Sequence, residues 1–255
     1  MKRILLAIAS VAILASSAMA GVPQIEKCNP WQPTDFRNES YIVQTGLVSW
    51  ASVTQTGDES YSTIKQSGTK DTATVIQNSN CCFLGHCSCG PTWAGIPIFT
   101  SSAYQNYSDI NQHGAGFHDA YVKQNGDGNY SKIDQSGCKD TAKVEQTGGF
   151  NSSTILQSGS ALNNAKVDQD GDLNCSYIKQ GGSGVNCATV DQDGFGNSSK
   201  ICQDGYAAIN TATVCQTGYM NLSDISQSGY GCHTAQVYQT NNCFNSHAVF
   251  CPVVK

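Results

Sequence analysis

The sequence predicts an all-β fold: a β-solenoid of stacked strand–turn–strand repeats with a cross-β, amyloid-forming core. Three observations lead to this prediction. A short motif recurs sixteen times, its fixed side chains occupy every second position, and a glycine follows most copies two residues after a glutamine. Period-two spacing is typical of a strand with one buried face, and a repeat of fixed length is typical of a solenoid.

Two half-units alternate along the chain. The first reads Ser-x-Ile-x-Gln, as in Ser153-x-Ile155-x-Gln157, and the second reads Ala-x-Val-x-Gln, as in Ala165-x-Val167-x-Gln169. Together they form eight repeats of about 22 to 24 residues. The first half-unit is centred on Ile42, Ile64, Ile110, Ile133, Ile155, Ile178, Ile201 and Ile225. The second is centred on Val53, Val75, Val122, Val144, Val167, Val190, Val214 and Val237.

Residues 1–20 have the pattern of a signal peptide. Lys2 and Arg3 precede an apolar run, Ile4–Ala15, and small residues at Ala18 and Ala20 suit a cleavage site. The run is too short to span a bilayer, and no later stretch is long and apolar enough. We therefore expect an exported chain that has no membrane span and begins near Gly21.

The remaining composition excludes several functions. Without Lys2 and Arg3 the formal charge changes from -5 to -7, which disfavours nucleic-acid binding through phosphate neutralisation. No nucleophile elbow and no His/Asp partner set accompanies the repeated serines, so we expect neither an enzyme nor a cofactor. Residues 21–37, rich in proline, are expected to be an extended leader or secretion segment, or simply a disordered terminus.

Residues 38–80 hold repeats 1 and 2, and residues 106–242 hold repeats 3 to 8. Each repeat is too small to bury its own inner face, so the repeats must stack. Stacking places each Ile, Val and Gln about 4.8 Å from its copy, and amide ladders then pair the buried glutamines. Eight rungs would be about 38 Å tall. The predicted core and assembly ladder includes Ile42, Gln44, Val53, Gln55, Ile155, Gln157, Val167, Gln169, Ile225, Gln227, Val237 and Gln239.

Residues 81–105 interrupt the pattern. Ile64 and Ile110 are 46 residues apart, an excess of one repeat, so this segment is either a rung without its motif or a loop outside the stack. Pro91 and Pro97 favour the loop, since proline cannot donate to a ladder. Its side chains also form the densest metal-ligand candidate, although disulfides are the alternative in an oxidising compartment. The candidate ligands are Cys81, Cys82, His86, Cys87 and Cys89.

Residues 243–255 look like a partial half-repeat in which His247 and Cys251 replace Ser and Gln. Pro252 should stop the strand, so we expect a C-terminal cap.

Thirteen cysteines in an exported chain predict disulfides, with at least one thiol left over. Cys175 and Cys187 occupy outward positions on the two halves of one repeat, and Cys202 and Cys215 do so on the next. The two members of each pair should point to opposite faces, so we expect them to join neighbouring fibres or bind metal rather than staple one monomer. The alternative is that these cysteines are tolerated surface substitutions.

The alternating half-units resemble the curlin repeat of the curli family, subunits of bacterial extracellular amyloid fibres. The resemblance covers all sixteen half-units. It implies a Gram-negative protein that is secreted through the periplasm and an outer-membrane pore, meets a nucleator subunit, and polymerises with itself into adhesive biofilm fibres. Eight repeats and thirteen cysteines depart from the usual five repeats and near absence of cysteine.

The resemblance also implies a gatekeeper role for Asp170, Asp193 and Asp204, whose stacked like charges would slow premature assembly. Turn formation is the alternative for these three residues. For the whole chain, two other functions stay open: a monomeric, disulfide-stabilised β-solenoid that serves as a binding or adhesin module, and a cysteine-bearing fibre that binds metal.

Overall fold

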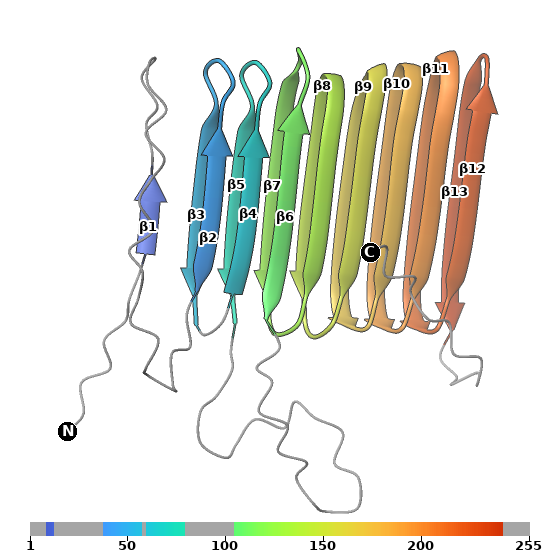
Figure 1. The fold of residues 1–255 in the computed structure, drawn as a ribbon. Helices are drawn as coiled ribbons and strands as arrows, with labels where there is room; N and C mark the ends of the chain where they lie inside the picture. The colour runs from blue at the N-terminus through green and yellow to red at the C-terminus, as the bar shows by residue number, and fades with distance from the viewer. Residues whose placement is uncertain (1–8, 13–37, 58–59, 80–104, 242–255) are drawn as a thin grey trace, which may run out of the picture.

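The structure is a computed structural model that describes residues 9–12, 38–57, 60–79 and 105–241. Within these residues the fold is all-β, without helices, and parallel strands stack into a β-solenoid of about eight turns (Figure 1). The predicted all-β solenoid of stacked strand–turn–strand repeats is thereby confirmed. The strands are β1 (Ala9–Ala12), β2 (Glu39–Gln44), β3 (Trp50–Thr56), β4 (Ser60–Gln66), β5 (Thr72–Asn78), β6 (Asn106–His113), β7 (Phe117–Asn125), β8 (Tyr130–Thr147), β9 (Ser152–Asp172), β10 (Cys175–Phe195), β11 (Ser198–Tyr219), β12 (Leu222–Gly229) and β13 (Cys232–Asn241).

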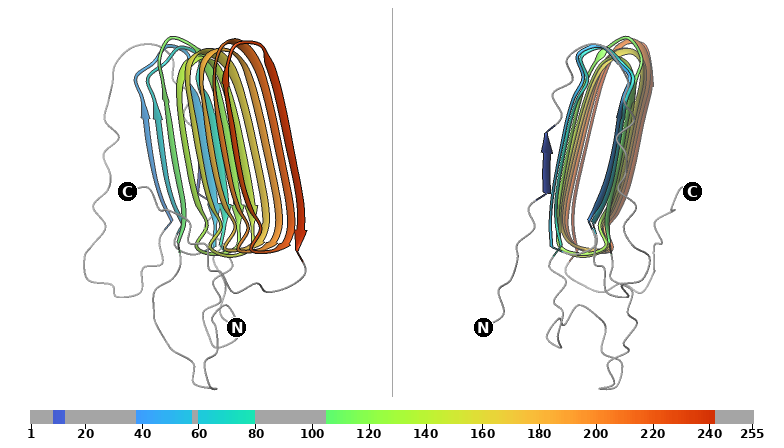
Figure 2. Two further views of the ribbon diagram at one scale, coloured as in Figure 1. Left: turned by 90° about the vertical axis from the view of Figure 1, so that its right-hand side faces the viewer. Right: turned by 60° about the vertical axis from the view of Figure 1, so that its left-hand side comes forward.

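Each repeat forms one rung with two facing strands. We number the rungs 1 to 8: β2 with β3, β4 with β5, β6 with β7, then β8, β9, β10 and β11, each of which supplies both sides of a rung, and finally β12 with β13. Viewed along the stack, the rungs superpose into one flattened loop with two long sides (Figure 2). The two sides are parallel sheets that enclose the core between them.

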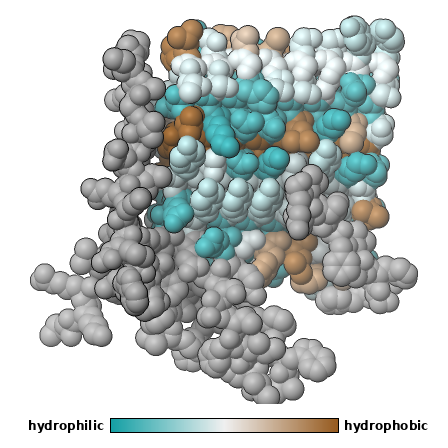
Figure 3. Space-filling model, in the orientation of Figure 1, coloured by the Kyte–Doolittle hydropathy of each residue, from teal (hydrophilic) through white to brown (hydrophobic). Residues whose placement is uncertain are grey.

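The register places each residue type on its own copy. Ile178 pairs with Ile155 below and Ile201 above, and Val190 pairs with Val167 and Val214 in the same way. The Ile, Val and Ala side chains of the half-units form one buried cluster, which thins at the ends, where Ile42 and Val237 are only partly buried. On the outside, side chains of similar hydropathy form rows across the strands (Figure 3).

The bend after the first half-unit differs from the expected turn. In rungs 4 to 7 one strand of 18 to 22 residues runs through the bend and both half-units. Parallel pairing continues into the bend between rungs 4 and 5 and between rungs 6 and 7, whereas between rungs 5 and 6 it stops at Gln180 and resumes at Val185. The bends cover residues 136–139, 158–162, 181–185 and 204–209, and their lengths therefore change between rungs 4 and 5 and between rungs 6 and 7. The register shifts lie at these two junctions, so a β-bulge absorbs each extra residue.

The bend after the second half-unit is tight and held by asparagine. In rung 5, Gly171 has a φ of 106° and Leu173 a φ of 59°, so the chain reverses through left-handed backbone. The next residue, Asn174, donates its side-chain amide to the carbonyls of Asp170 at 3.1 Å and Gly194 at 3.0 Å. Its backbone N–H donates to Asn151 Oδ1 at 3.0 Å. A column of such asparagines therefore ties each bend to its neighbours.

Rungs 2 and 3 pair directly with each other. Gln66 lies opposite Gln112, and Gln77 lies opposite Gln124, in continuous parallel register. No rung intervenes between them, so the stack is continuous across the interruption in the sequence. The interruption itself, residues 81–105, and the expected cap, residues 243–255, lie outside the described residues.

One strand forms where the sequence predicts a cleaved segment. β1, within residues 1–20, pairs antiparallel with β3, with Val11 opposite Val53. We expected this segment to take no part in the fold. The outer edge of β3 presents unpaired backbone donors and acceptors, and an extended apolar segment satisfies them.

Candidate assembly surface

Two files of glutamine amides run through the core, one in each sheet. In the first, each Nε2 donates to Oε1 of the next rung at 2.7 to 2.9 Å, and the file joins Gln44, Gln66, Gln112, Gln135, Gln157, Gln180, Gln203 and Gln227. The second file, also at 2.7 to 2.9 Å, joins Gln55, Gln77, Gln124, Gln146, Gln169, Gln192, Gln216 and Gln239. The predicted ladder residues are all present in these files or in the Ile and Val columns beside them.

In all of these glutamines except Gln44, the side-chain amide also donates to a backbone carbonyl in the opposite sheet. Gln146 donates to the carbonyl of Tyr130 at 3.0 Å, and Gln157 donates to the carbonyl of Thr141 at 2.9 Å. Each acceptor belongs to the preceding half-unit. The glutamines therefore join neighbouring rungs and also tie the two sheets together, with a stagger of half a rung.

The two ends of the solenoid are complementary. At the C-terminal end, Gln227 and Gln239 each donate one N–H across the core and have no ladder acceptor among the described residues. At the N-terminal end, Gln44 and Gln55 donate to the glutamines of rung 2. Within the described ranges, no N–H donates to the Oε1 atoms of Gln44 and Gln55. One end thus presents donors and the other presents acceptors. Such a head-to-tail relationship generates open filaments rather than closed pairs.

The backbone edges at these ends are also available. Among the named strands, β12 and β13 each pair only with β11, and β2 pairs only with β4. β13 alternates between exposed and half-exposed residues, where the matching strand β5 alternates between half-exposed and buried ones. A ninth rung would bury this face. The outer edge of β3 is covered by β1.

Seven of the eight repeated serines are buried, but their hydroxyls do not hydrogen-bond to one another. Their hydroxyls find no partner within the described part of the chain. This holds for Ser62, Ser108, Ser131, Ser153, Ser176, Ser199 and Ser223. The serine side chain therefore acts here through its small size, which lets the facing sheets approach.

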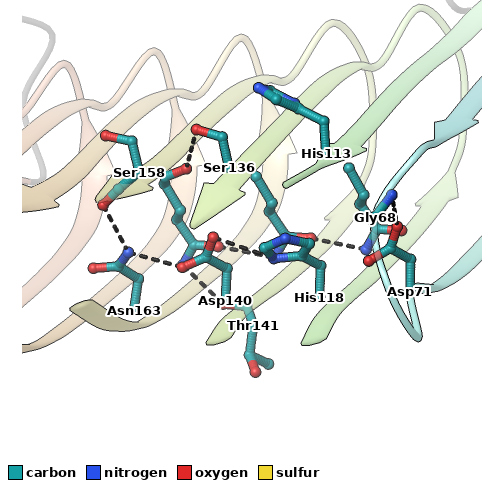
Figure 4. A network of polar contacts seen from close by, with 12 residues as sticks. Gly68, Asp71, His113, His118, Ser136, Asp140, Thr141, Ser158 and Asn163 are labelled. Carbon is teal, nitrogen blue, oxygen red and sulfur yellow. Dashed lines mark hydrogen bonds and ion pairs between the residues drawn. The ribbon is translucent and has the colours of Figure 1, made fainter. Parts of the chain in front are cut away.

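The structure reveals a polar column that the sequence analysis missed. Its residues lie two positions before the alanine of the second half-unit and point into the core (Figure 4). The signal was present in the period-two spacing that identified the serine column, but the residue type varies. The column contains Asp71, His118, Asp140, Asn163, Asn186, Asn210 and His233, each aligned with the next.

The predicted gatekeepers lie on the outside. Asp170 pairs with Asp193 on adjacent rungs of one sheet, whereas Asp204 lies in the bend after the other sheet, opposite Ser228. Two residues before Asp170, Asp168 is stacked between Glu145 and Asp191. Burial raises the pKa of Asp168, and the two neighbouring carboxylates raise it further, against the lowering effect of Lys166. A stack of like charges does exist on this face, and its effect on assembly stays a prediction.

The cysteines follow the predicted placement with one correction. Cys187, Cys202 and Cys215 are free and partly exposed, and Cys187 and Cys202 lie in opposite sheets. Cys175 instead is buried and disulfide-bonded, so it is not available to join neighbouring fibres. The position of Cys175 in the repeat could not predict the disulfide, because a disulfide also depends on where the partner cysteine lies.

The metal-ligand candidates Cys81, Cys82, His86, Cys87 and Cys89 lie outside the described residues. Within the described ranges, no group of three or more His, Cys, Asp or Glu side chains is arranged to hold a metal ion. The same part of the chain contains no helix suited to crossing a membrane.

Comparison with known proteins leaves the chain without a matched relative: no protein-family model, no curated protein and no solved structure matches it. The class of protein is therefore defined by the fold alone. It is an all-β solenoid of parallel stacked strands.

Proposed function

We propose that this chain is the structural subunit of an extracellular curli-like amyloid fibre, which self-assembles by edge-strand addition for cell adhesion and biofilm matrix. The observation that carries the proposal is the complementarity of the two ends. Gln227 and Gln239 offer amide donors where Gln44 and Gln55 offer amide acceptors. A second copy placed on the C-terminal end would continue both ladders.

Adding a copy would also bury apolar surface. Ile42 and Val237 are only partly covered at opposite ends, whereas the equivalent side chains inside the stack are fully buried. Burying a fully exposed side chain of this kind is worth about 1.5 to 3 kcal/mol, and each of these partly covered residues would gain part of that. The backbone of the new rung would pair along its length, as β10 pairs with β11.

Removal of the predicted signal peptide during export is consistent with the same proposal. β1 lies inside the predicted signal peptide, and its removal would free the edge of β3. Among the described residues, both strands of rung 1 would then have an unpaired edge. By resemblance to the curli family, its partners would be further copies of itself, a nucleator subunit and an outer-membrane secretion pore.

The experiment is fibre diffraction. The mature chain, 21–255, is transferred from denaturant into buffer under reducing conditions, and aligned material is exposed to X-rays. Reflections near 4.7 to 4.8 Å and about 10 Å support the fibre. A soluble, folded chain that stays monomeric for days would overturn it.

One observation favours the second candidate, a monomeric binding or adhesin module held by disulfides. Cys175 is disulfide-bonded and buried. If the oxidised chain stays monomeric while the Cys175→Ser variant forms fibres, the disulfide-stabilised monomer is the functional form.

A further inference from the structure

The polar column changes character along the stack. From rung 5 to rung 7 it is a neutral amide ladder, in which Asn186 donates to Asn163 at 2.9 Å and Asn210 donates to Asn186 at 2.8 Å. In rungs 2 to 4 the same positions are Asp71, His118 and Asp140. Three ionisable side chains therefore replace three amides inside an otherwise neutral core.

These three side chains are deeply buried and close together. The side chains of His118 and Asp140 are both 0% exposed, and His118 Nδ1 lies 3.3 Å from Asp140 Oδ2. Asp71 is also fully buried, and its Oδ2 accepts the Gly68 N–H at 2.8 Å. Figure 4 shows His118 between the two carboxyl groups.

Hydrogen bonding within the described chain leaves this group incomplete. The 3.3 Å approach of His118 Nδ1 to Asp140 Oδ2 does not have the geometry of a hydrogen bond, so both ring nitrogens of His118 and Asp140 Oδ2 are buried without a hydrogen-bond partner there. Asp71 Oδ1 is buried without one as well. The other oxygen of Asp140 accepts the Asn163 amide at 2.8 Å. The unsatisfied atoms are therefore the ones that can bind a proton: the imidazole nitrogens and one oxygen of each neighbouring carboxyl group.

The surrounding elements supply no other buried cation. On β6, His113 is 45% exposed and lies 3.5 Å from Asp134, outside the core. The Lys70 and Lys139 ammonium groups lie over the exposed Phe117 ring, at 4.9 and 5.9 Å from its centroid. Across the core the column faces the neutral amides of the first glutamine file, and Asp119 on β7 points outward.

The protonation of these three side chains determines how much net charge is buried in the core. With both carboxylates ionised, a neutral His118 leaves two buried negative charges, and a protonated His118 still leaves one. Uncompensated buried charge is costly, so proton uptake should favour the folded stack. The pKa of Asp71 is accordingly raised, mainly by burial, against the lowering effect of the Gly68 N–H and of His118.

We propose that the Asp71–His118–Asp140 column is an acid-responsive element that stabilises rungs 2 to 4 of the solenoid when it takes up protons. A proton on the imidazole and a second on one carboxyl group make the column neutral, like the Asn163–Asn186–Asn210 ladder above it. The element rests on the fold and does not depend on fibre formation. In a fibre it would favour growth in mildly acidic surroundings.

The Asn ladder of the same chain provides the test variant. In D71N/H118N/D140N the neutral ladder would run through rungs 2 to 7. The mature chain and this variant are unfolded in guanidinium chloride at pH 5 and at pH 8, in whichever state, monomer or fibre, each adopts. Each proton taken up on folding can change the folding equilibrium by up to about tenfold per pH unit. We expect the pH 8 to pH 5 ratio of unfolding rates to fall on the order of tenfold in the variant, with slower unfolding at pH 8.

Two further variants complete the test. H118N alone removes the imidazole that lies between the two carboxyl groups and can take up a proton to offset their charge, so it should unfold faster than the unaltered chain at pH 8 and regain most of that loss at pH 5. D224N, which changes an exposed carboxyl group on rung 8, should leave the ratio unchanged. The proposal is overturned if the triple variant keeps the full pH dependence, or, should that variant not fold, if H118N unfolds with the unaltered chain's pH dependence. Because neither readout requires fibres, failure of the fibre proposal would not alter the result.

Discussion

The Nε2 atom of Gln157 donates a 2.9 Å hydrogen bond to Oε1 of Gln180 on the next rung. Gln180 in turn donates to Gln203 Oε1 at 2.9 Å and to the Asn164 carbonyl at 3.0 Å. One side chain therefore holds three partners in two sheets. An unsatisfied buried polar group costs about 1 to 3 kcal/mol, so the loss of one glutamine side chain should destabilise the folded stack.

Gln180→Ala should be strongly destabilising. It leaves the Gln157 N–H and the Asn164 carbonyl without partners and opens a cavity, at a combined cost of about 2 to 5 kcal/mol. Denaturant unfolding measures the loss. Lys179→Ala, on the exposed side of the same strand, is the control, and an equal loss in both variants would contradict the role of the amide.

Ser153→Ala should be neutral or stabilising, by about 1 kcal/mol. Its hydroxyl is buried without a partner in the described chain, so its removal relieves a desolvation cost. Asn151→Ala is the contrasting change, because Asn151 donates to the carbonyls of Thr147 and Gly171. Unfolding midpoints should separate the two variants in opposite directions; a marked loss in Ser153→Ala would show that the hydroxyl has a partner.

Ile155→Asp should abolish both the folded stack and fibre growth, because Ile155 is fully buried and the new carboxylate would have no cation. Leu156→Asp places the same charge on the outer, half-exposed face and should be tolerated. Fibre yield by sedimentation and strand content by circular dichroism measure the outcome. Normal growth of Ile155→Asp would mean that Ile155 is not in the assembled core.

The bend before Asn174 predicts opposite results for two neighbouring residues. At Gly171, φ is 106° and an added Cβ would lie 2.1 Å from the Gly194 carbonyl oxygen, so Gly171→Ala should disrupt the stack. Leu173 is exposed and left-handed, and glycine occupies the equivalent position at Gly196. Leu173→Gly should therefore gain about 1 kcal/mol. Thermal unfolding of both variants tests the pair, and destabilisation by Leu173→Gly would contradict it.

Asp109 adds a pH dependence on the outer face. Burial raises its pKa and the Asp134 carboxylate raises it further, against the lowering effect of Lys65 and Lys132. A carboxyl group whose pKa is higher in the folded than in the unfolded state loses its stabilising contribution as pH rises through the folded pKa. Asp109→Asn should therefore be more stable than the unaltered chain at pH 7 and no more stable at pH 3. Denaturant midpoints at both pH values check this, with the exposed Asp224→Asn as the control.

Much of the fold could be predicted from particular residues. The columns headed by Ile155 and Val167 follow from period-two spacing and from a nearly constant repeat length, which together allow only one register. The stacking of glutamine on glutamine follows as well. The long strands of rungs 4 to 7 could not be predicted in this way. A strand continues through a bend only if the neighbouring rung bends in the same way and pairs with it there, as rungs 4 and 5 do.

The sequence by itself determined the rungs, their order and the inward residues, because these depend only on the chain's local period. Tertiary structure alone decided that rungs 2 and 3 meet directly, that glutamine's second N–H crosses to the preceding half-unit, and that Cys175 is disulfide-bonded. It also brought Asp71, His118 and Asp140 together, though they are far apart in sequence. The crossing of the glutamine N–H depends on which half-unit faces which across the core, and the other features depend on which rungs are direct neighbours and on where the partner of a cysteine lies. A one-dimensional period specifies none of these.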